Sequence, residues 1–531
     1  MITRDVQGRG GLTAEVKARL DEARRQVATV GARPVMAELG RVERVGDGVA
    51  VLSGLARCRL DEILMFPGNV YGMAVTLERD EVGAVLLDSD RTISAGDEVC
   101  GTGEVVRVPV GEGLLGRVVD PLGRPLDDGP AIPLTLTEPI ERPAPRIIDR
   151  ELVTQALQTG LLVVDALIPL GRGQRELIVG DRSTGKTAIA VDAILNQTRS
   201  DVISVYCAVG QKASAVARVI DTVRRSGPMD RTIFVVASSD DPPGLQWIAP
   251  YAACCMAEYF RDRGGHALLV VDDLTKHAAV HRQVSLLLRN PPGREAYPGD
   301  VFFIHSRLLE RAAKLHQSHG GGSLTALPIA ETQAGNISAY IPTNLISITD
   351  GQIILEPKLF NEGHKPAVNV GKSVSRVGGK TQHKALKEVS GSLKLDYAQF
   401  LELEVFTKFG QMVDAHSRET IEHGRRIRAV LGQTQSAPLS LAAEVAILLA
   451  LKERVLAALT PEQIEGFKHG LTEAVAMELG AIADRIDITG LLTAGDRSEL
   501  MAWLKTRATL VMEARPGPAP PAGSGGGAPG L

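Results

Sequence analysis

Residues 180–187 read Gly180–Asp181–Arg182–Ser183–Thr184–Gly185–Lys186–Thr187, which is the pattern G-x-x-x-x-G-K-T. The apolar run Leu177–Val179 precedes this stretch, and a helical pattern from Ala188 to Gln197 follows it. Strand, glycine loop and helix in this order form a phosphate-binding loop, because backbone N–H groups and the positive end of the helix dipole face the phosphates. A chance G-K-T in a turn would lack the two flanking elements. The stretch therefore predicts an α/β domain that binds a nucleotide.

The residue types within this loop predict individual roles. Lys186 can reach the β- and γ-phosphates, and the Thr187 hydroxyl can ligate Mg²⁺. The remaining loop residues would surround the phosphates with backbone N–H groups; they are Gly180, Asp181, Arg182, Ser183, Thr184 and Gly185. The loop alone therefore indicates ATP and Mg²⁺ as ligands.

A second nucleotide-site signal is the apolar run Ala267–Val271 followed by Asp272–Asp273. A carboxylate at the end of a buried strand would lie near the Mg²⁺ shell of a phosphate-binding loop. The alternative is a strand that ends in a solvated acidic turn. Because the glycine loop is present upstream, the sequence favours Asp272 as a Mg²⁺ ligand, directly or through water.

Hydrolysis requires a group that orients or deprotonates the attacking water. The position that would hold it, after the apolar run Val202–Cys207, is Gln211. An amide cannot act as a general base at neutral pH, although it can orient water. The residues alone leave open that Gln211 is simply a polar loop residue, so the sequence predicts a binding site of doubtful hydrolytic competence.

Length and composition limit the class of protein. The chain has 531 residues, of which 44% are hydrophobic and 23% charged, which is typical of a soluble protein with several domains. A net charge of −4 and 4% aromatic residues argue against nucleic-acid binding. The five cysteines lack a C-x-x-C spacing and are expected to be reduced thiols of a cytosolic protein. No apolar run is long enough to span a bilayer, so membrane association is expected only through partners.

The pattern of residues divides the chain into five segments. We expect a helical N-terminal segment over residues 1–33, with its helix from Ala14 to Val30, and a β-barrel of short strands over 34–108. Residues 109–388 contain apolar runs that predict a parallel sheet covered on both faces, namely Leu177–Val179, Val202–Val205, Ile233–Val236, Ala267–Val271 and Val301–Ile304. Residues 389–512 have helical periodicity and predict a bundle, and the Pro/Gly-rich residues 513–531 are expected to be disordered.

A third signal is the segment Pro366–Gly379, which has many turn residues and contains Arg376. The guanidinium of arginine stays charged and can bind phosphate oxygens in a bidentate manner, as an arginine finger does. From the residues alone, a surface arginine in a salt bridge is the favoured interpretation.

Long distinctive strings accompany these motifs: Pro109–Asp120 (PVGEGLLGRVVD), Gly171–Gly180 (GRGQRELIVG), Pro291–Ala296 (PPGREA) and Pro366–Gly379. Together they resemble the alpha subunit of rotary F-type ATP synthases, over about residues 14 to 510. The resemblance implies an N-terminal β-barrel, a central RecA-like P-loop NTPase domain and a C-terminal α-helical bundle. It also implies an alpha3beta3 hexamer, with gamma, delta-type and epsilon subunits and a peripheral stalk, at the cytoplasmic face of the bacterial inner membrane.

The same resemblance implies roles for individual residues. Alpha subunits hold a non-catalytic MgATP and lend an arginine to the catalytic site of the neighbouring beta subunit, while the complex translocates H⁺ or Na⁺. The match points to Arg376 as this finger, to Ser373 as a nearby residue needed for activity, and to Gln211 where beta subunits have a glutamate. It places Gln433 and Gln435 near the adenine, with Phe360 close by.

The sequence departs from the family pattern at several positions. Ser183 stands where alpha subunits usually have Gln, Lys365 where they have Arg, and Lys372 where they have an apolar residue. With the Pro/Gly tail, these departures resemble alternative copies of the subunit, some of which are linked to Na⁺.

Two other functions are compatible with a nucleotide-binding loop. The first is a self-sufficient ATPase such as a hexameric helicase or secretion ATPase, and Gln211 argues against it. The second is an assembly scaffold, and the intact loop argues against it.

Overall fold

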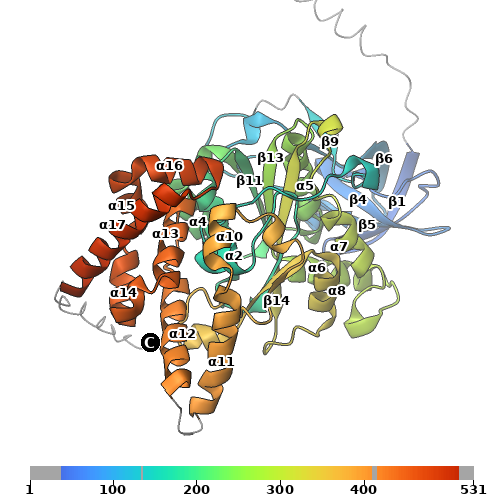
Figure 1. Ribbon diagram of the computed structural model, residues 1–531. Coiled ribbons are helices and arrows are strands. Elements are labelled where there is room, and N and C mark those ends of the chain that lie inside the picture. Colours follow the sequence, from blue (N-terminus) through green and yellow to red (C-terminus); the bar gives the residue numbers. More distant parts are fainter. Residues whose placement is uncertain (1–37, 133–135, 409–414, 514–531) are drawn as a thin grey trace, which may run out of the picture.

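The computed structural model describes residues 38–132, 136–408 and 415–513. A β-barrel, a central α/β domain and a helical bundle follow one another along this part of the chain, with the α/β domain in the middle (Figure 1). This confirms the predicted three-part architecture. The helix expected at Ala14–Val30 and the Pro/Gly tail from residue 514 lie outside the described residues. Among the described helices, none is both long and apolar enough to cross a bilayer.

The N-terminal domain is a closed barrel in the strand order β1-β2-β5-β4-β3-β6. Its strands are β1 (Glu38–Gly46), β2 (Val49–Ser53), β3 (Glu62–Phe66), β4 (Val70–Leu77), β5 (Val82–Leu86) and β6 (Glu98–Val105). Side chains such as Leu52, Leu64 and Leu86 fill its interior. The antiparallel pair β7 (Arg107–Pro109) and β9 (Thr137–Pro139) connects the barrel to the next domain.

An eight-stranded sheet forms the centre of the α/β domain, in the order β16-β15-β10-β14-β13-β11-β12-β8. The strands are β8 (Val118–Val119), β10 (Leu177–Asp181), β11 (Val202–Gln211), β12 (Thr232–Ser238), β13 (His266–Asp272), β14 (Ser323–Thr332), β15 (Gly351–Leu355) and β16 (Val374–Ser375). Neighbouring strands are parallel, except that β16 is antiparallel to β15.

Helices cover both faces of this sheet, as the apolar strands predicted (Figure 1). They are α2 (Leu162–Leu167), α3 (Lys186–Leu195), α4 (Ala213–Ser226), α5 (Pro243–Arg261), α6 (Leu274–Leu287), α7 (Val301–Leu309), α8 (Tyr340–Ile348) and α9 (Pro357–Asn361). One core contains α3 and continues into the bundle, and the other contains α5, α6 and α7.

The strand predicted at Val301–Ile304 is wrong, because these residues begin helix α7. Val301, Ile304 and Leu308 are buried while Phe302 and Phe303 are exposed, which is a helical spacing that a four-residue run is too short to reveal. The sequence analysis also predicted no strand at β14, which lies between β10 and β13, and none at β8, β15 or β16.

The C-terminal domain is helical, as predicted. Its helices are α10 (Lys384–Ser390), α11 (Leu393–Lys408), α12 (Ala415–Leu431), α13 (Leu441–Lys452), α14 (Pro461–Lys468), α15 (Leu471–Glu478), α16 (Gly480–Thr489) and α17 (Ala494–Glu513). Every residue of α13 from Leu441 to Leu451 is buried. A helix that is apolar on all sides needs neighbours on all sides, so α13 forms the centre of the bundle.

Candidate nucleotide-binding site

The glycine loop lies at the carboxyl end of β10, where α3 begins. Gly185 precedes α3 with a φ of 99°, a left-handed conformation that glycine adopts without steric cost. The Thr184 hydroxyl and the Lys186 ammonium both donate hydrogen bonds to the carbonyl oxygen of Asp181, at 2.8 and 2.7 Å. These two hydrogen bonds join the end of the loop to its start and place the Lys186 side chain over the loop. Ser183 is exposed, so its departure from the family pattern changes the surface of the loop and not its packing.

Asp181 anchors the start of the loop to the neighbouring strand. Its carboxylate accepts hydrogen bonds from the Thr332 hydroxyl at 2.6 Å and from the Gly335 backbone at 2.8 Å. Thr332 ends β14, which pairs with β10. The adjacent Arg182 is exposed.

Asp272 is the hub of the polar contacts at this edge of the sheet. Its buried carboxylate accepts hydrogen bonds from the Thr187 hydroxyl (2.6 Å), the Tyr206 hydroxyl (2.9 Å) and the Gln211 amide (2.8 Å). Three residues singled out from the sequence are thus brought together, because the parallel strands β10, β13 and β11 all end at the same edge of the sheet. Thr187 and Asp272 offer the hard oxygen atoms that suit Mg²⁺, which usually binds to one or two carboxylates plus substrate phosphates.

Gln211 is held between a cation and an anion. Its amide nitrogen faces Asp272, and its carbonyl oxygen accepts a hydrogen bond from the Lys276 ammonium at 2.8 Å. Lys276 also donates to the carbonyl oxygen of Gly210 at 3.0 Å, which ties the end of β11 to α6. In this arrangement the site contains no free general base at position 211.

The site is rich in carboxylates. Burial lowers the pKa of Lys186, whereas the carboxylates of Glu331 and Asp273 counteract this effect. Burial and the neighbouring Asp272 raise the pKa of Asp273 to about 7. The negative charge of these carboxylates therefore favours binding of a nucleotide that carries a metal cation over binding of a nucleotide without one.

A cavity of about 850 Å³ opens beside the loop. It is lined by Thr184 and Gly185 of the loop, by Phe360, and by Gln433 and Gln435 after α12, so the predicted adenine residues converge on one space. Lys365 lies over the Phe360 ring, with 4.9 Å between its ammonium and the ring centroid. The Gln433 side chain is also a domain link, since its oxygen accepts a hydrogen bond from the Leu162 backbone and its amide donates to Gly160.

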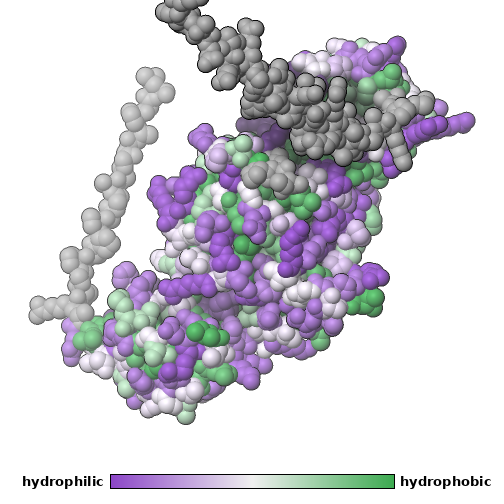
Figure 2. Space-filling view, turned by 90° about the horizontal axis from the view of Figure 1, so that it is seen from above, coloured by the Kyte–Doolittle hydropathy of each residue, from purple (hydrophilic) through white to green (hydrophobic). Residues whose placement is uncertain are grey.

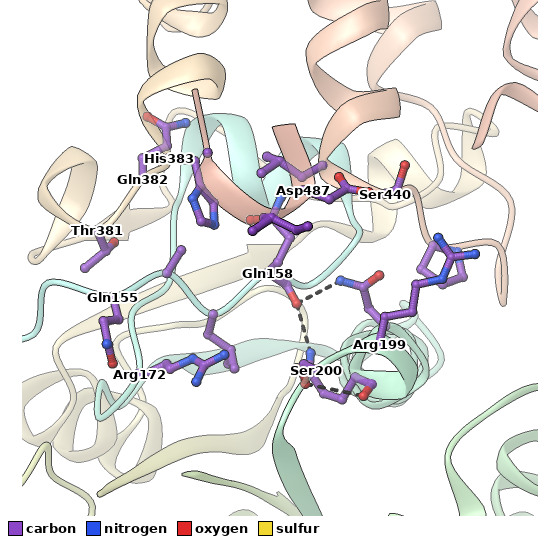
Figure 3. Close-up of a pocket in the computed structure, with 18 of the residues that line it drawn as sticks. Gln155, Gln158, Arg172, Arg199, Ser200, Thr381, Gln382, His383, Ser440 and Asp487 are labelled. Carbon is purple, nitrogen blue, oxygen red and sulfur yellow. Dashed lines mark hydrogen bonds between the residues drawn. The ribbon is translucent and has the colours of Figure 1, made fainter. Parts of the chain in front are cut away.

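A larger cavity, of about 1540 Å³, lies between the α/β domain and the bundle (Figure 3). Gln158, Arg172 and Ser200 line it on one side, and His383 and Asp487 on the other. Asn196 and Gln197 fix this wall by donating hydrogen bonds to the Gln158 carbonyl oxygen. No residue of the glycine loop lines this cavity, so it is separate from the nucleotide site.

Arg376 lies at the opposite edge of the sheet from the glycine loop. Leu177 of β10 pairs with Gln352, and Gly351 pairs with Ser375, so Arg376 follows at the amino end of β10. With a rise of about 3.3 Å per residue, this places Arg376 roughly 20 Å from the loop. Its guanidinium donates to the carbonyl oxygens of Thr349 and Ile346 at 3.2 Å, at the end of α8.

The side chain of Arg376 is exposed and pairs with no carboxylate among the described residues. The described residues therefore offer no carboxylate for the salt bridge that the residues alone favoured for Arg376. Ser373 is fully buried; its hydroxyl accepts a hydrogen bond from the Ile354 backbone and donates to the Asn369 carbonyl oxygen. It fastens the segment before Arg376 to β15.

Comparison with known proteins identifies the family. The chain matches models described as "ATP synthase alpha/beta family, nucleotide-binding domain" over residues 160–375, "ATP synthase alpha/beta chain, C terminal domain" over 382–506, and "ATP synthase alpha/beta family, beta-barrel domain" over 35–103. This chain belongs to the ATP synthase alpha/beta family. In this order, the three matched segments fall in the α/β domain, the bundle and the barrel.

Similar proteins place the chain on the alpha side of this family. It is 56% identical to "ATP synthase subunit alpha 2" of Gluconobacter oxydans (strain 621H), over 93% of this chain and 97% of that protein. It is 60% identical to "ATP synthase subunit alpha 1" and 57% identical to "ATP synthase subunit alpha 3" of Paraburkholderia xenovorans (strain LB400), over 82% and 92% of this chain, and 86% and 92% of those proteins. The resemblance to alpha subunits is therefore confirmed, and these relatives carry copy numbers in their names.

The sequence analysis missed two residues of the Asp272 cluster. Tyr206 lies inside an apolar strand, where a hydroxyl needs a buried partner, and that was a usable signal. Lys276 lies in the first turn of α6, after the Asp272–Asp273 pair. Only the pairing of β11 with β13 brings it to Gln211, so the sequence carried no signal for this contact.

Proposed function

We propose that this chain is the non-catalytic, regulatory alpha subunit of an ATP synthase head. It binds MgATP in its own site and supplies Arg376 to the catalytic site of a neighbouring beta subunit. The assembled complex couples ATP synthesis or hydrolysis to the translocation of H⁺ or Na⁺ across the membrane.

The observation that carries this proposal is the separation of Arg376 from the glycine loop by the full length of β10. An arginine side chain cannot cross roughly 20 Å of strand, so Arg376 cannot serve the nucleotide of its own chain. An exposed guanidinium held by backbone carbonyls is available to a neighbouring subunit. A guanidinium supplied from a neighbour stabilises the charge that develops during phosphoryl transfer.

The chain's own site supports binding without hydrolysis. Lys186 and the backbone of Gly180–Thr187 would hold the phosphates, while Thr187 and Asp272 would hold Mg²⁺. Bound Mg²⁺ would neutralise phosphate charge. Gln211, held by Lys276, supplies no general base, and Phe360, Gln433 and Gln435 would surround the adenine.

Exposed apolar side chains support assembly with other subunits. Ile147, Ile148 and Leu152 are 89%, 75% and 83% exposed within six residues of chain, and Phe303 is 61% exposed. Such side chains gain free energy when a partner covers them. Elsewhere hydrophilic and hydrophobic residues intermix on the surface viewed in Figure 2. The partners would be beta and gamma subunits, delta-type and epsilon subunits and a peripheral stalk, which would hold the chain at the cytoplasmic face of the bacterial inner membrane.

The decisive experiment measures MgATP turnover by this chain alone and after co-assembly with its beta and gamma partners. We expect no turnover alone and turnover in the complex. In the complex, Arg376→Ala should leave assembly intact and lower turnover by about 10³–10⁵-fold, the range for arginine fingers. Turnover by the chain alone would instead identify a self-sufficient ATPase, and an unchanged rate in assembled Arg376→Ala would remove the finger role.

A further inference from the structure

A pair of buried polar side chains lies next to β16, the strand that ends just before Arg376. Glu176 immediately precedes β10 and is completely buried, as is Gln174. The register of the sheet places Glu176 level with Gly351 of β15 and Ser375 of β16. It therefore lies beside the antiparallel pair β15 and β16, next to Arg376 and far from the glycine loop.

Gln174 connects Glu176 to this strand. Its amide nitrogen donates to the Glu176 carboxyl at 2.8 Å and to the Ser375 hydroxyl at 3.1 Å. The Ser375 hydroxyl donates in turn to the Pro169 carbonyl oxygen at 2.8 Å and accepts a hydrogen bond from the Gly378 backbone at 3.1 Å. These bonds fix the backbone on both sides of Arg376.

Gly351 shows how closely β15 approaches this group. A Cβ at position 351 would stand 2.5 and 2.8 Å from the two carboxyl oxygens of Glu176, and 2.3 Å from the Val374 carbonyl oxygen. No side chain fits in this space. The carboxyl of Glu176 therefore packs directly against the backbone that pairs with β16.

The Glu176 carboxyl is unusual because it is a titratable group that is completely buried. One of its oxygens, Oε1, is buried and has no hydrogen-bond partner among the described residues. Burial raises the pKa of Glu176 well above its usual range, and Asp350 adds to this effect while Arg376 opposes it. An uncharged carboxyl explains how the group is tolerated without a cation of its own.

We propose that Glu176 and Gln174 are positioning residues for Arg376. Gln174 donates a hydrogen bond to Ser375, and Glu176 packs against Gly351 at the start of β15. These contacts fix the backbone before Arg376 and therefore the position of its guanidinium at the neighbouring catalytic site. The inference rests on the proposed function of Arg376. Neither side chain reaches the surface, so both can act on Arg376 only through the backbone of β15 and β16.

The expected consequence is a loss of transition-state stabilisation and not of binding. A displacement of about 1 Å in a catalytic group can cost about 10²-fold in rate. Glu176→Met keeps a similar length but removes both carboxyl oxygens, so the Gln174 amide loses one of its two acceptors and keeps only the Ser375 hydroxyl. Glu176→Gln keeps the shape and an acceptor oxygen for Gln174 in an uncharged group.

The experiment compares these variants in the complete alpha–beta–gamma complex. Glu176→Met should lower kcat by about 10- to 100-fold with little change in KM, while Glu176→Gln should stay within about twofold of the parent. The matched control is Glu444→Met, which removes another fully buried glutamate, in α13 of the bundle. This control should leave the kcat of assembled complexes within about twofold.

A second readout separates positioning from folding. Glu176→Met should weaken inhibition by MgADP–aluminium fluoride, which mimics the transition state, about as much as it lowers kcat, and leave MgADP binding unchanged. A purely structural role would reduce only the yield of complexes. Equal kcat for Glu176→Met and the control, or an equally impaired Glu176→Gln, would overturn the inference. If Arg376→Ala itself leaves turnover unchanged, the proposed function fails instead, whatever Glu176 does.

Discussion

The substitution Asp272→Asn tests the Mg²⁺ site without disturbing the fold. The carboxylate accepts three hydrogen bonds, from Thr187, Tyr206 and Gln211. An asparagine of the same shape can turn its oxygen to the Gln211 amide, and the two hydroxyls can rotate to accept from its amide nitrogen. Each oxygen and nitrogen of the cluster then keeps a hydrogen-bond partner, although the hydrogens of the two hydroxyl groups lose their acceptor, and the main change is the loss of one negative charge.

The magnitude follows from what that charge does. Substituting a residue that hydrogen-bonds to a metal ligand, as Asp272 does to Thr187, typically costs about 10–100-fold in metal affinity. This range corresponds to about 1.4–2.7 kcal/mol. We therefore expect MgATP to bind this chain about 10–100-fold more weakly in Asp272→Asn, and ATP without Mg²⁺ to bind no more weakly than in the parent.

The assay titrates a fluorescent ATP analogue into the purified chain, once with Mg²⁺ and once with EDTA. Thr187→Ser is the control, because it keeps the hydroxyl that bonds to Asp272. The reasoning is refuted if Asp272→Asn weakens binding equally in both conditions, since the carboxylate would then act on the loop and not through the metal.

Two further predictions concern the same chain. Lys186→Ala should weaken nucleotide binding with and without Mg²⁺ but lower the turnover of the complex less than Arg376→Ala does; loss as complete as that of a beta-site variant would contradict the non-catalytic assignment. Burial and the neighbouring Asp165 raise the pKa of Glu444 well above its usual range, so the folded chain holds a proton that the unfolded chain releases. This contribution to the free energy of unfolding is complete at low pH and is lost as pH rises through the folded pKa. Glu444→Gln, which keeps a donor towards Asp165, should therefore raise the unfolding temperature more at about pH 8 than at about pH 5, and an equal change at both would contradict the assignment.

Local patterns predicted the fold because each depends on neighbours in sequence. The glycine loop needs only the strand before it and the helix after it, and the buried strands show as apolar runs. The run Val301–Ile304 was assigned to a strand because a short apolar run looks the same in a strand and at the start of a helix. The burial of Leu308 one turn later, together with the exposure of Phe302 and Phe303, distinguishes α7.

The candidate site was predictable where its residues belong to motifs, and not where packing assembles it. Thr187 and Asp272 were predicted because both follow apolar strands. The contact of Lys276 with Gln211 depends on which strands are adjacent, and the approach of Phe360 to Gln433 depends on how the bundle meets the α/β domain. The residues alone indicated a core aromatic and a polar loop there, and the resemblance supplied the adenine role.

The strand β15 connects the two functional edges of this chain. Its first residue, Gly351, packs on Glu176 and pairs with β16, which ends just before Arg376. Its last residue, Leu355, pairs with Gly180 and lines the nucleotide cavity. Substitutions more than about 7–10 Å apart usually have additive effects. Glu176 precedes β10 and Lys186 follows the loop at its other end, so the two lie farther apart than this. Non-additivity between Lys186→Ala and Glu176→Met in the turnover of the complex would therefore measure the coupling through β15 between the nucleotide site and Arg376. Strict additivity would mean that the nucleotide held by this chain and the arginine it lends act independently.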